Sequence, residues 1–133
     1  MNLSARLEAF KSLGEQLRNI SEAELDEWYF RATSYNNWFT RENVVHAVKA
    51  LGEMLEAEKL EQWISNYDLP EESSKKIAII MAGNIPLVGF HDFLSVLISG
   101  NSVIAKLSSQ DPYLLKEIVA KLIAINPEFE NKI

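Results

Sequence analysis

Three polar side chains follow the ends of two apolar segments, and their types and spacing could support catalysis or ligand binding. Residues 77–108 read IAIIMAGNIPLVGFHDFLSVLISGNSVIAKLS. Asn84 follows the first apolar run, whereas Lys106 and Ser108 close the second. The amide NH₂ of an asparagine can stabilise a developing oxyanion without titrating. A lysine ammonium can bind a nucleotide's ribose or phosphate, and a serine hydroxyl can hydrogen-bond the same ligand.

Each of these side chains also has a purely structural interpretation. Asn84 can cap the following helix or support the turn that precedes it. Lys106 can extend its alkyl stem along the apolar strand and reach solvent with its ammonium group. Ser108 can be an ordinary loop residue. The residue types alone leave both interpretations open.

The segment that carries them predicts one parallel βαβ unit. Residues 77–81 form a continuous apolar run, which is typical of a parallel strand covered on both faces. Residues 87–99 predict a well-buried helix that Pro86 opens and a left-handed Gly100 closes. Residues 103–107 predict the second strand. The carboxyl ends of such strands meet at one edge, where open α/β sheets bind cofactors.

Helices are predicted on both sides of this unit. Apolar residues recur at helical spacing through the first 70 residues, and Ser21 and Thr40 are expected to cap two of these helices. Asp111 and Pro112 predict the N-cap and first position of a last helix, which Pro127 stops. The expected organisation is a helical amino-terminal subdomain at 1–69, a linker at 70–76 and an α/β domain at 77–133.

Composition excludes several classes of function. The 133-residue chain has a net charge of −6, so it lacks the basic surface that nucleic-acid binding requires. It contains no cysteine, which excludes disulfides and thiol nucleophiles within these residues. No apolar run is long enough to cross a bilayer, so we expect a cytoplasmic protein that is not membrane-bound. No metal-ligand spacing occurs, and His46 and His91 are interpreted as ordinary core or surface histidines.

Two segments resemble the first nucleotide-binding segment of the aldehyde dehydrogenase superfamily. They are Gly83-Asn84-Ile85-Pro86-Leu87 and GNSVIAKLS at 100–108. The sequence NWFTRENV at 37–44 is more similar to the acyl-CoA reductase branch, which is related to the fatty-acid reductase of bacterial bioluminescence. Leu107 stands where aldehyde dehydrogenases have proline, and the family's catalytic cysteine and second glycine-rich turn are missing.

The resemblance implies an oxidoreductase that uses NADPH or NADH to reduce a fatty acyl thioester to an aldehyde through a cysteine thioester. The substrate would be an acyl-CoA or an acyl group on a carrier protein. By the same resemblance, Asn84 matches the oxyanion-stabilising asparagine and Lys106 the lysine that binds the adenosine ribose. Ser108 lies where cofactor preference is tuned. The chain is then expected to be the amino-terminal part of a longer enzyme and to be inactive alone.

A second hypothesis is a non-catalytic helical interaction module. Two parallel strands leave their edges open, which favours association between copies of the chain. The aromatic residues between positions 28 and 39 fit either an acyl-chain pocket or a helical core and interface.

Overall fold

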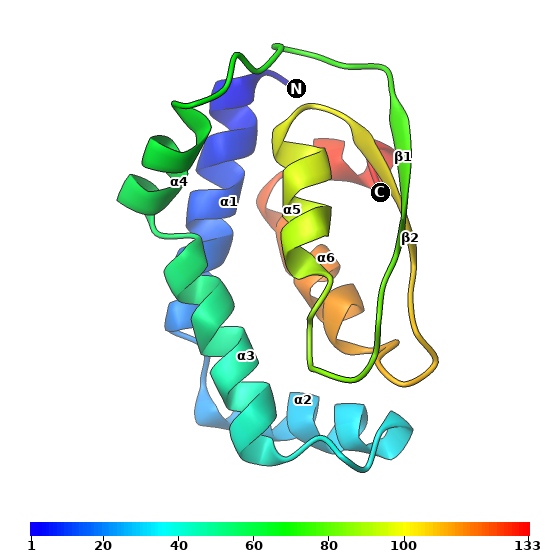
Figure 1. Ribbon diagram of the computed structural model, residues 1–133. Helices are drawn as coiled ribbons and strands as arrows, with labels where there is room; N and C mark the ends of the chain where they lie inside the picture. The colour runs from blue at the N-terminus through cyan, green and yellow to red at the C-terminus, as the bar shows by residue number, and fades with distance from the viewer.

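The structure is a computed structural model that describes all residues 1–133, with the helices on one side of a small parallel sheet (Figure 1). In chain order the elements are α1 (Leu3–Arg18), α2 (Glu22–Tyr35), α3 (Arg41–Met54), α4 (Ala57–Ile64), β1 (Lys76–Ile80), α5 (Phe90–Ile98), β2 (Ser102–Lys106), α6 (Leu114–Ile125) and the 3₁₀ helix η1 (Pro127–Asn131). This confirms an α/β fold that is rich in helix. None of the helices has the length and apolar character needed to cross a membrane.

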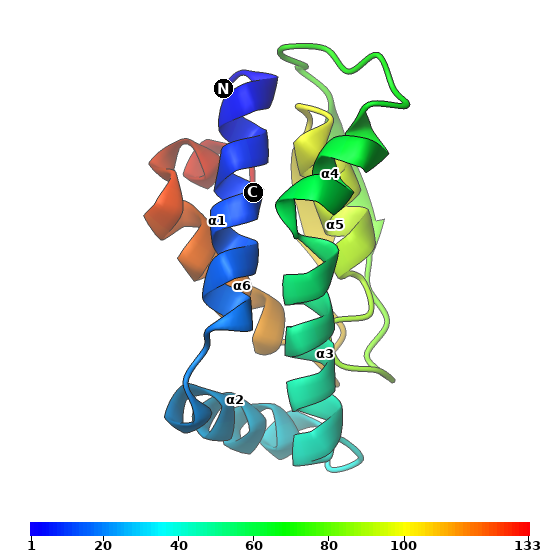
Figure 2. The same cartoon turned by 90° about the vertical axis from the view of Figure 1, so that its left-hand side faces the viewer.

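The amino-terminal helices begin at the predicted caps. The Ser21 hydroxyl accepts a hydrogen bond from the Glu24 amide at 3.1 Å, and the Thr40 hydroxyl accepts one from the Asn43 amide at 3.1 Å. Each bond satisfies an amide that has no partner within the helix. Helices α1 and α3 pack side by side, whereas α2 lies crosswise at the end of the pair (Figure 2).

The two strands pair in parallel, as the βαβ pattern predicts. Lys76 aligns with Ser102 and Ile80 with Lys106, and the Met81 amide adds one more bond to the Lys106 carbonyl at 3.0 Å. Each strand begins one residue earlier than the sequence indicates. Helix α5 connects the strands and packs on one face of the sheet.

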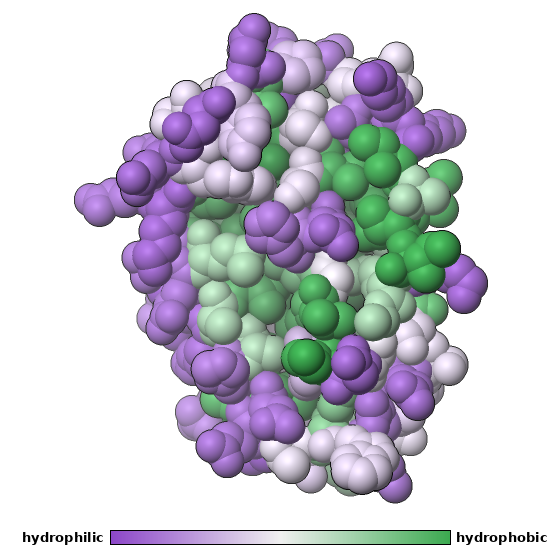
Figure 3. Space-filling view, in the orientation of Figure 1, coloured by the Kyte–Doolittle hydropathy of each residue, from purple (hydrophilic) through white to green (hydrophobic).

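The other face of the sheet is open, so the expectation of strands covered on both faces is wrong for these residues. Ile80 is 84% exposed and Ile104 is 59% exposed, although both side chains are apolar. They lie on the same face because side chains alternate along a strand and the two strands are in register. Figure 3 shows hydrophobic side chains gathered on the strand side of the molecule.

Helix α5 differs from its prediction at its start. It begins at Phe90 rather than at residue 87, because Leu87 has a left-handed backbone with φ 59° that a helix cannot include. The helix is well buried, as predicted, and only His91 and Asp92 within it are exposed. Gly100, with φ 87°, ends the helix region in the predicted left-handed conformation.

The last helix also starts later than predicted. Helix α6 begins at Leu114, and no side chain caps it. Asp111 is therefore not its N-cap; the Asp111 carboxylate instead accepts a hydrogen bond from the Leu87 amide at 2.9 Å. Pro127 follows the end of α6 and begins η1.

One hydrophobic core joins the helical and α/β parts of the chain. Its 27 buried residues include Phe10 and Leu13 of α1, Val48 of α3, Phe93 of α5 and Ile118 of α6. Phe10 contacts Phe129 of η1 in an edge-to-face arrangement with ring centroids 5.6 Å apart. The core therefore crosses the expected boundary at residues 70–76.

A buried arginine connects α1 to the segments that enter the two strands. Arg6 is 2% exposed, and its guanidinium donates to four backbone carbonyls. The acceptors are Ile98 at 3.0 Å, Met1 at 2.7 Å, Pro70 at 2.8 Å and Glu71. Five donors in a rigid fork suit this role, which a lysine could not fill. Arg6 thus connects the segments that precede the two strands.

Candidate functional site at the carboxyl ends of the strands

The segment 81–89 leaves β1 as a sequence of turns. The Val88 amide donates to the Ile85 carbonyl at 3.3 Å, and the Phe90 amide donates to the Leu87 carbonyl at 3.0 Å. From the helical side, the buried Asn36 amide donates to the Gly83 carbonyl at 2.9 Å. The turn that carries Asn84 is therefore held by contacts from distant parts of the chain.

Asn84 is exposed and lines a groove between this turn and α3. The groove has a volume of about 390 Å³. Its other lining residues are Asn43, His46, Ala47, Ala50, Leu51, Ile85 and Pro86. Helix α5 begins six residues later without a side-chain cap, so Asn84 does not cap that helix, and a role in supporting the turn stays open. The groove combines an apolar wall with the amides of Asn43 and Asn84.

Lys106 is the last residue of β2, and its side chain is exposed on the same open face as Ile80 and Ile104. It takes part in none of the nine ion pairs of the structure. Its ammonium group is thus available to a ligand. Lys106 does not line the groove beside Asn84, and convergence of the two groups on one ligand stays a prediction.

Ser108 lies against Gly83, which brings the exits of the two strands into contact. A Cβ atom on Gly83 would collide with the Ser108 side chain, so only glycine allows this close packing. The Ser108 hydroxyl also accepts a hydrogen bond from the Gln110 amide at 3.2 Å. Ser108 therefore has a structural role in the loop, and its hydroxyl hydrogen is still available to donate.

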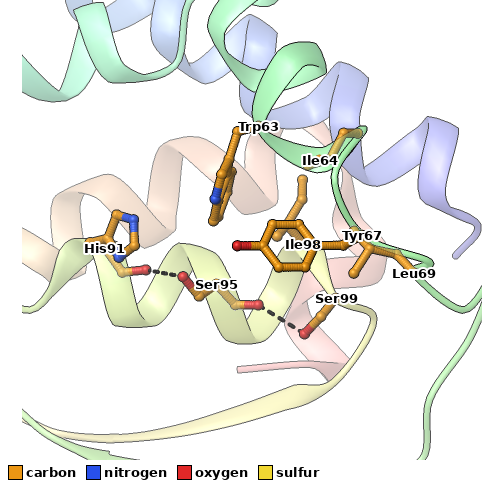
Figure 4. Close-up of a pocket in the computed structure, with 8 residues that line it drawn as sticks. All are labelled: Trp63, Ile64, Tyr67, Leu69, His91, Ser95, Ile98 and Ser99. Carbon is orange, nitrogen blue, oxygen red and sulfur yellow. Dashed lines mark hydrogen bonds between the residues drawn. The ribbon is translucent and has the colours of Figure 1, made fainter.

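A second groove, of about 330 Å³, lies between α4 and α5 (Figure 4). Trp63 and Tyr67 face His91 and Ser95 of α5 and Ser99, which caps the carboxyl end of that helix. The Ser95 hydroxyl donates to the His91 carbonyl at 2.8 Å, and the Ser99 hydroxyl donates to the Ser95 carbonyl at 2.8 Å. Because these hydroxyls bond their own helix, the groove offers less reactive chemistry than the one beside Asn84.

The histidines and aromatic residues occupy several different places. His91 is exposed and packs near Trp63, with ring centroids 5.5 Å apart. His46 is exposed on α3 and lines the groove beside Asn84. Trp28 and Phe39 belong to the core, whereas Phe30, Tyr35 and Trp38 are exposed. The aromatic residues thus do not form one pocket. No group of three or more acidic or histidine side chains is arranged to bind a metal.

The sequence did not predict the roles of two residues at this edge. They are Asn36, which bonds the Gly83 carbonyl, and Asp111, which bonds the Leu87 amide. Burial raises the pKa of the Asp111 carboxyl, and the nearby backbone amides of Leu87 and Leu114 partly oppose this shift. A buried acid with so few partners is an unusual feature for a loop.

Comparison with known proteins adds a family to this geometry. The sequence profile of the acyl-CoA reductase (LuxC) family matches residues 11–132. The chain belongs to the acyl-CoA reductase (LuxC) family. The match covers the helices of the amino-terminal half as well as the βαβ unit, and so includes Asn84, Lys106 and Ser108.

One protein that is similar to the chain is a long-chain acyl-protein thioester reductase of Aliivibrio fischeri. It is 30% identical to this LuxC-family chain over 71 residues, which are 52% of the chain and 15% of the relative. The chain therefore spans only a small part of the length of that relative. No solved structure matches the chain at a significant level.

Proposed function

We propose that this chain is the amino-terminal part of an NAD(P)H-dependent acyl-CoA reductase, which converts a fatty acyl thioester to an aldehyde. Membership of the LuxC family supports the reaction class. The observation that carries the proposal is the exposed Asn84 amide beside an open groove at the carboxyl end of β1. The aldehyde-dehydrogenase-like organisation of the parent enzyme belongs to the same proposal.

In this mechanism the Asn84 NH₂ group donates to the carbonyl oxygen of the thioester. Negative charge develops on that oxygen when a nucleophile or a hydride attacks the carbonyl carbon, and a fixed donor stabilises it. An amide does not titrate near neutral pH, so its donor stays available throughout the reaction. The apolar wall of the groove, which includes Ala47, Leu51 and Ile85, offers a surface for the acyl group.

A reduced nicotinamide dinucleotide would supply the hydride. Lys106 fits a contact with the cofactor's ribose or phosphate, because its ammonium is exposed and forms no ion pair. Ser108 fits a supporting role, since its oxygen already accepts a hydrogen bond from the loop. The chain has no cysteine, so the thiol of the expected thioester intermediate must come from a part of the enzyme outside these residues.

The direct test is turnover of the longer enzyme after Asn84→Ala substitution. We expect the catalytic rate to fall roughly 100- to 1000-fold, as when one oxyanion donor is removed. Asn37→Ala is the matched control, because Asn37 is also an exposed asparagine in a turn. Equal turnover in the Asn84 and Asn37 variants would refute the role of Asn84.

The cofactor contact has its own test by titration of NADPH into the longer enzyme. Lys106→Ala should weaken NADPH binding, whereas Lys76→Ala should leave it unchanged. Lys76 is the better control because it is exposed on the same face of the sheet at the opposite end of the strands. If both variants bind NADPH with unaltered affinity, Lys106 is not a cofactor ligand.

The open sheet face favours a second candidate function, self-association through the strands. Ile80 and Ile104 form an exposed apolar surface, whose contact with water is unfavourable. Sedimentation of the 133-residue chain distinguishes the two candidates. Concentration-dependent association that Ile80→Lys abolishes would support the interaction module, whereas a monomer at all concentrations would remove it.

A further inference from the structure

Leu87 is held in a conformation that its side chain disfavours. With φ 59° it is the only residue other than glycine that has a positive φ. A left-handed backbone costs a leucine about 1–2 kcal/mol, because Cβ approaches the following carbonyl oxygen. Such strain persists only where the surrounding structure imposes it. The contacts of Leu87 therefore show what fixes the turn.

The decisive contact comes from the loop after β2. The Leu87 amide donates to Oδ2 of Asp111 at 2.9 Å in a buried position, although the two residues are 24 positions apart. The Leu87 side chain is 5% exposed and belongs to the core. The backbone hydrogen bond and the buried side chain together hold Leu87 in its strained state.

The burial of Asp111 is itself energetically unfavourable. Its residue is 8% exposed, and its Oδ1 atom is the one buried side-chain polar atom without a hydrogen-bond partner. Leaving a buried acceptor unsatisfied costs about 1–3 kcal/mol. The carboxyl forms no ion pair and does not cap α6. Stability alone does not account for an acid in this position.

We propose that Asp111 is a positioning residue, which fixes the turn 83–89 through the Leu87 amide and thereby sets the direction of Asn84. This inference rests on the proposed function of Asn84. Asn84 stands between two anchored points, since Asn36 holds the Gly83 carbonyl and Asp111 holds the Leu87 amide. A donor fixed on both sides loses little freedom when an oxyanion forms.

The same bond couples the two strand exits. Asp111 follows β2 in the loop that contains Ser108, and Ser108 packs on Gly83 of the other exit. Any displacement of the loop after β2 is then transmitted to the turn that carries Asn84. In the proposed enzyme, the loop that follows Lys106 thus helps to position Asn84, which donates to the thioester.

The hydrogen bond between the Leu87 amide and Asp111 is tested first, by amide hydrogen exchange of the ¹⁵N-labelled 133-residue chain. Asp111→Ala should speed exchange of the Leu87 amide roughly tenfold to a hundredfold, because the bond to a charged acceptor is lost. Asp111→Asn has the same shape and keeps an acceptor oxygen, so it should give a smaller increase. Asp92→Ala, at an exposed acid of α5, is the control. Unchanged Leu87 exchange in Asp111→Ala would overturn the proposal.

The functional part is tested by turnover of the longer enzyme. Asp111→Ala should lower the rate of thioester reduction, and Asp111→Asn should restore part of it. Because Asp111 acts through Asn84, the Asn84→Ala/Asp111→Ala double variant should be no slower than Asn84→Ala alone. Additive losses would overturn the positioning role. Full turnover of Asn84→Ala would instead refute the proposed function, and the Leu87 exchange measurement does not depend on that result.

Discussion

At the amino ends of the strands, the guanidinium of the buried Arg6 donates hydrogen bonds to four backbone carbonyls. At the carboxyl ends, the opposite holds. Asp111 keeps one oxygen without a partner, Leu87 is strained, and Lys106 and Asn84 are exposed. Each end contains one buried charged residue, yet only at the amino ends does each side-chain nitrogen or oxygen of that residue have a hydrogen-bond partner.

The difference supports the proposal that the amino ends of the strands have a structural role and that the carboxyl ends bind ligands. Buried polar groups are ordinarily paired, and the exceptions in a folded protein concentrate at sites that bind or react. The Arg6 contacts fix the entry of both strands and the end of α5. The carboxyl ends carry strain and unpaired groups, which is where α/β sheets bind their ligands.

The largest expected effect is the loss of Arg6. Arg6→Ala should lower the free energy of unfolding by about 3 kcal/mol or more, because several buried carbonyls lose their donor. Arg6→Lys should lose less, since it keeps the charge but offers a different donor geometry. Urea unfolding of the 133-residue chain measures both. Arg31→Ala is the control, at an exposed arginine paired only with Glu27. An Arg6→Ala loss no larger than that of Arg31→Ala would break the comparison.

A smaller effect is expected at Gly100, beside the Arg6 guanidinium. Its φ of 87° disfavours any residue with a Cβ atom, and that atom would lie 3.4 Å from the guanidinium. Gly100→Ala should therefore lower the free energy of unfolding by about 1–2 kcal/mol. Gly100→Asn should cost less, because asparagine tolerates a left-handed backbone better. Thermal unfolding of the two variants checks this order, and a more stable alanine variant would contradict it.

The smallest effect is a pH dependence from Asp111. Burial raises the pKa of its carboxyl in the folded chain above the ordinary value that it has when unfolded. The folded state therefore binds the proton more tightly, and the Asp111 contribution to stability falls as pH rises through the raised pKa. Asp111→Asn does not titrate and should lack this contribution. Urea unfolding of both chains from acid to neutral pH measures it; parallel profiles would argue against a raised pKa.

Local signals in the sequence predicted the elements, and contacts between distant residues decided the site. The Ser21 and Thr40 hydroxyls accept hydrogen bonds from amides three residues later, so these caps could be predicted from the sequence. Asp111 was expected to cap α6 by the same rule, but it bonds an amide 24 residues earlier. Only the folded arrangement of both strand exits brings that amide within reach.

Arg6 shows the same limit more strongly. Its helix reads as an ordinary amphipathic helix, and an arginine there is expected to face solvent. Its acceptors at Pro70, Glu71 and Ile98 lie 64 to 92 residues away, and main-chain carbonyls carry no signature in the sequence. The start of α5 was missed for a related reason, because nothing in the residue types predicts a left-handed leucine.

The most direct test maps ligand contacts on both ends of the strands. Hydrogen exchange of the longer enzyme, followed by mass spectrometry with and without NADPH and an unreactive acyl thioester analogue, reports each segment separately. If the carboxyl ends of the strands bind the ligands, amide exchange at 81–89 and 106–112 should slow when the ligands are bound. Exchange at 68–75 and 98–102, at the amino ends, should stay unchanged. Protection confined to the amino ends, or to the groove between α4 and α5, would contradict it.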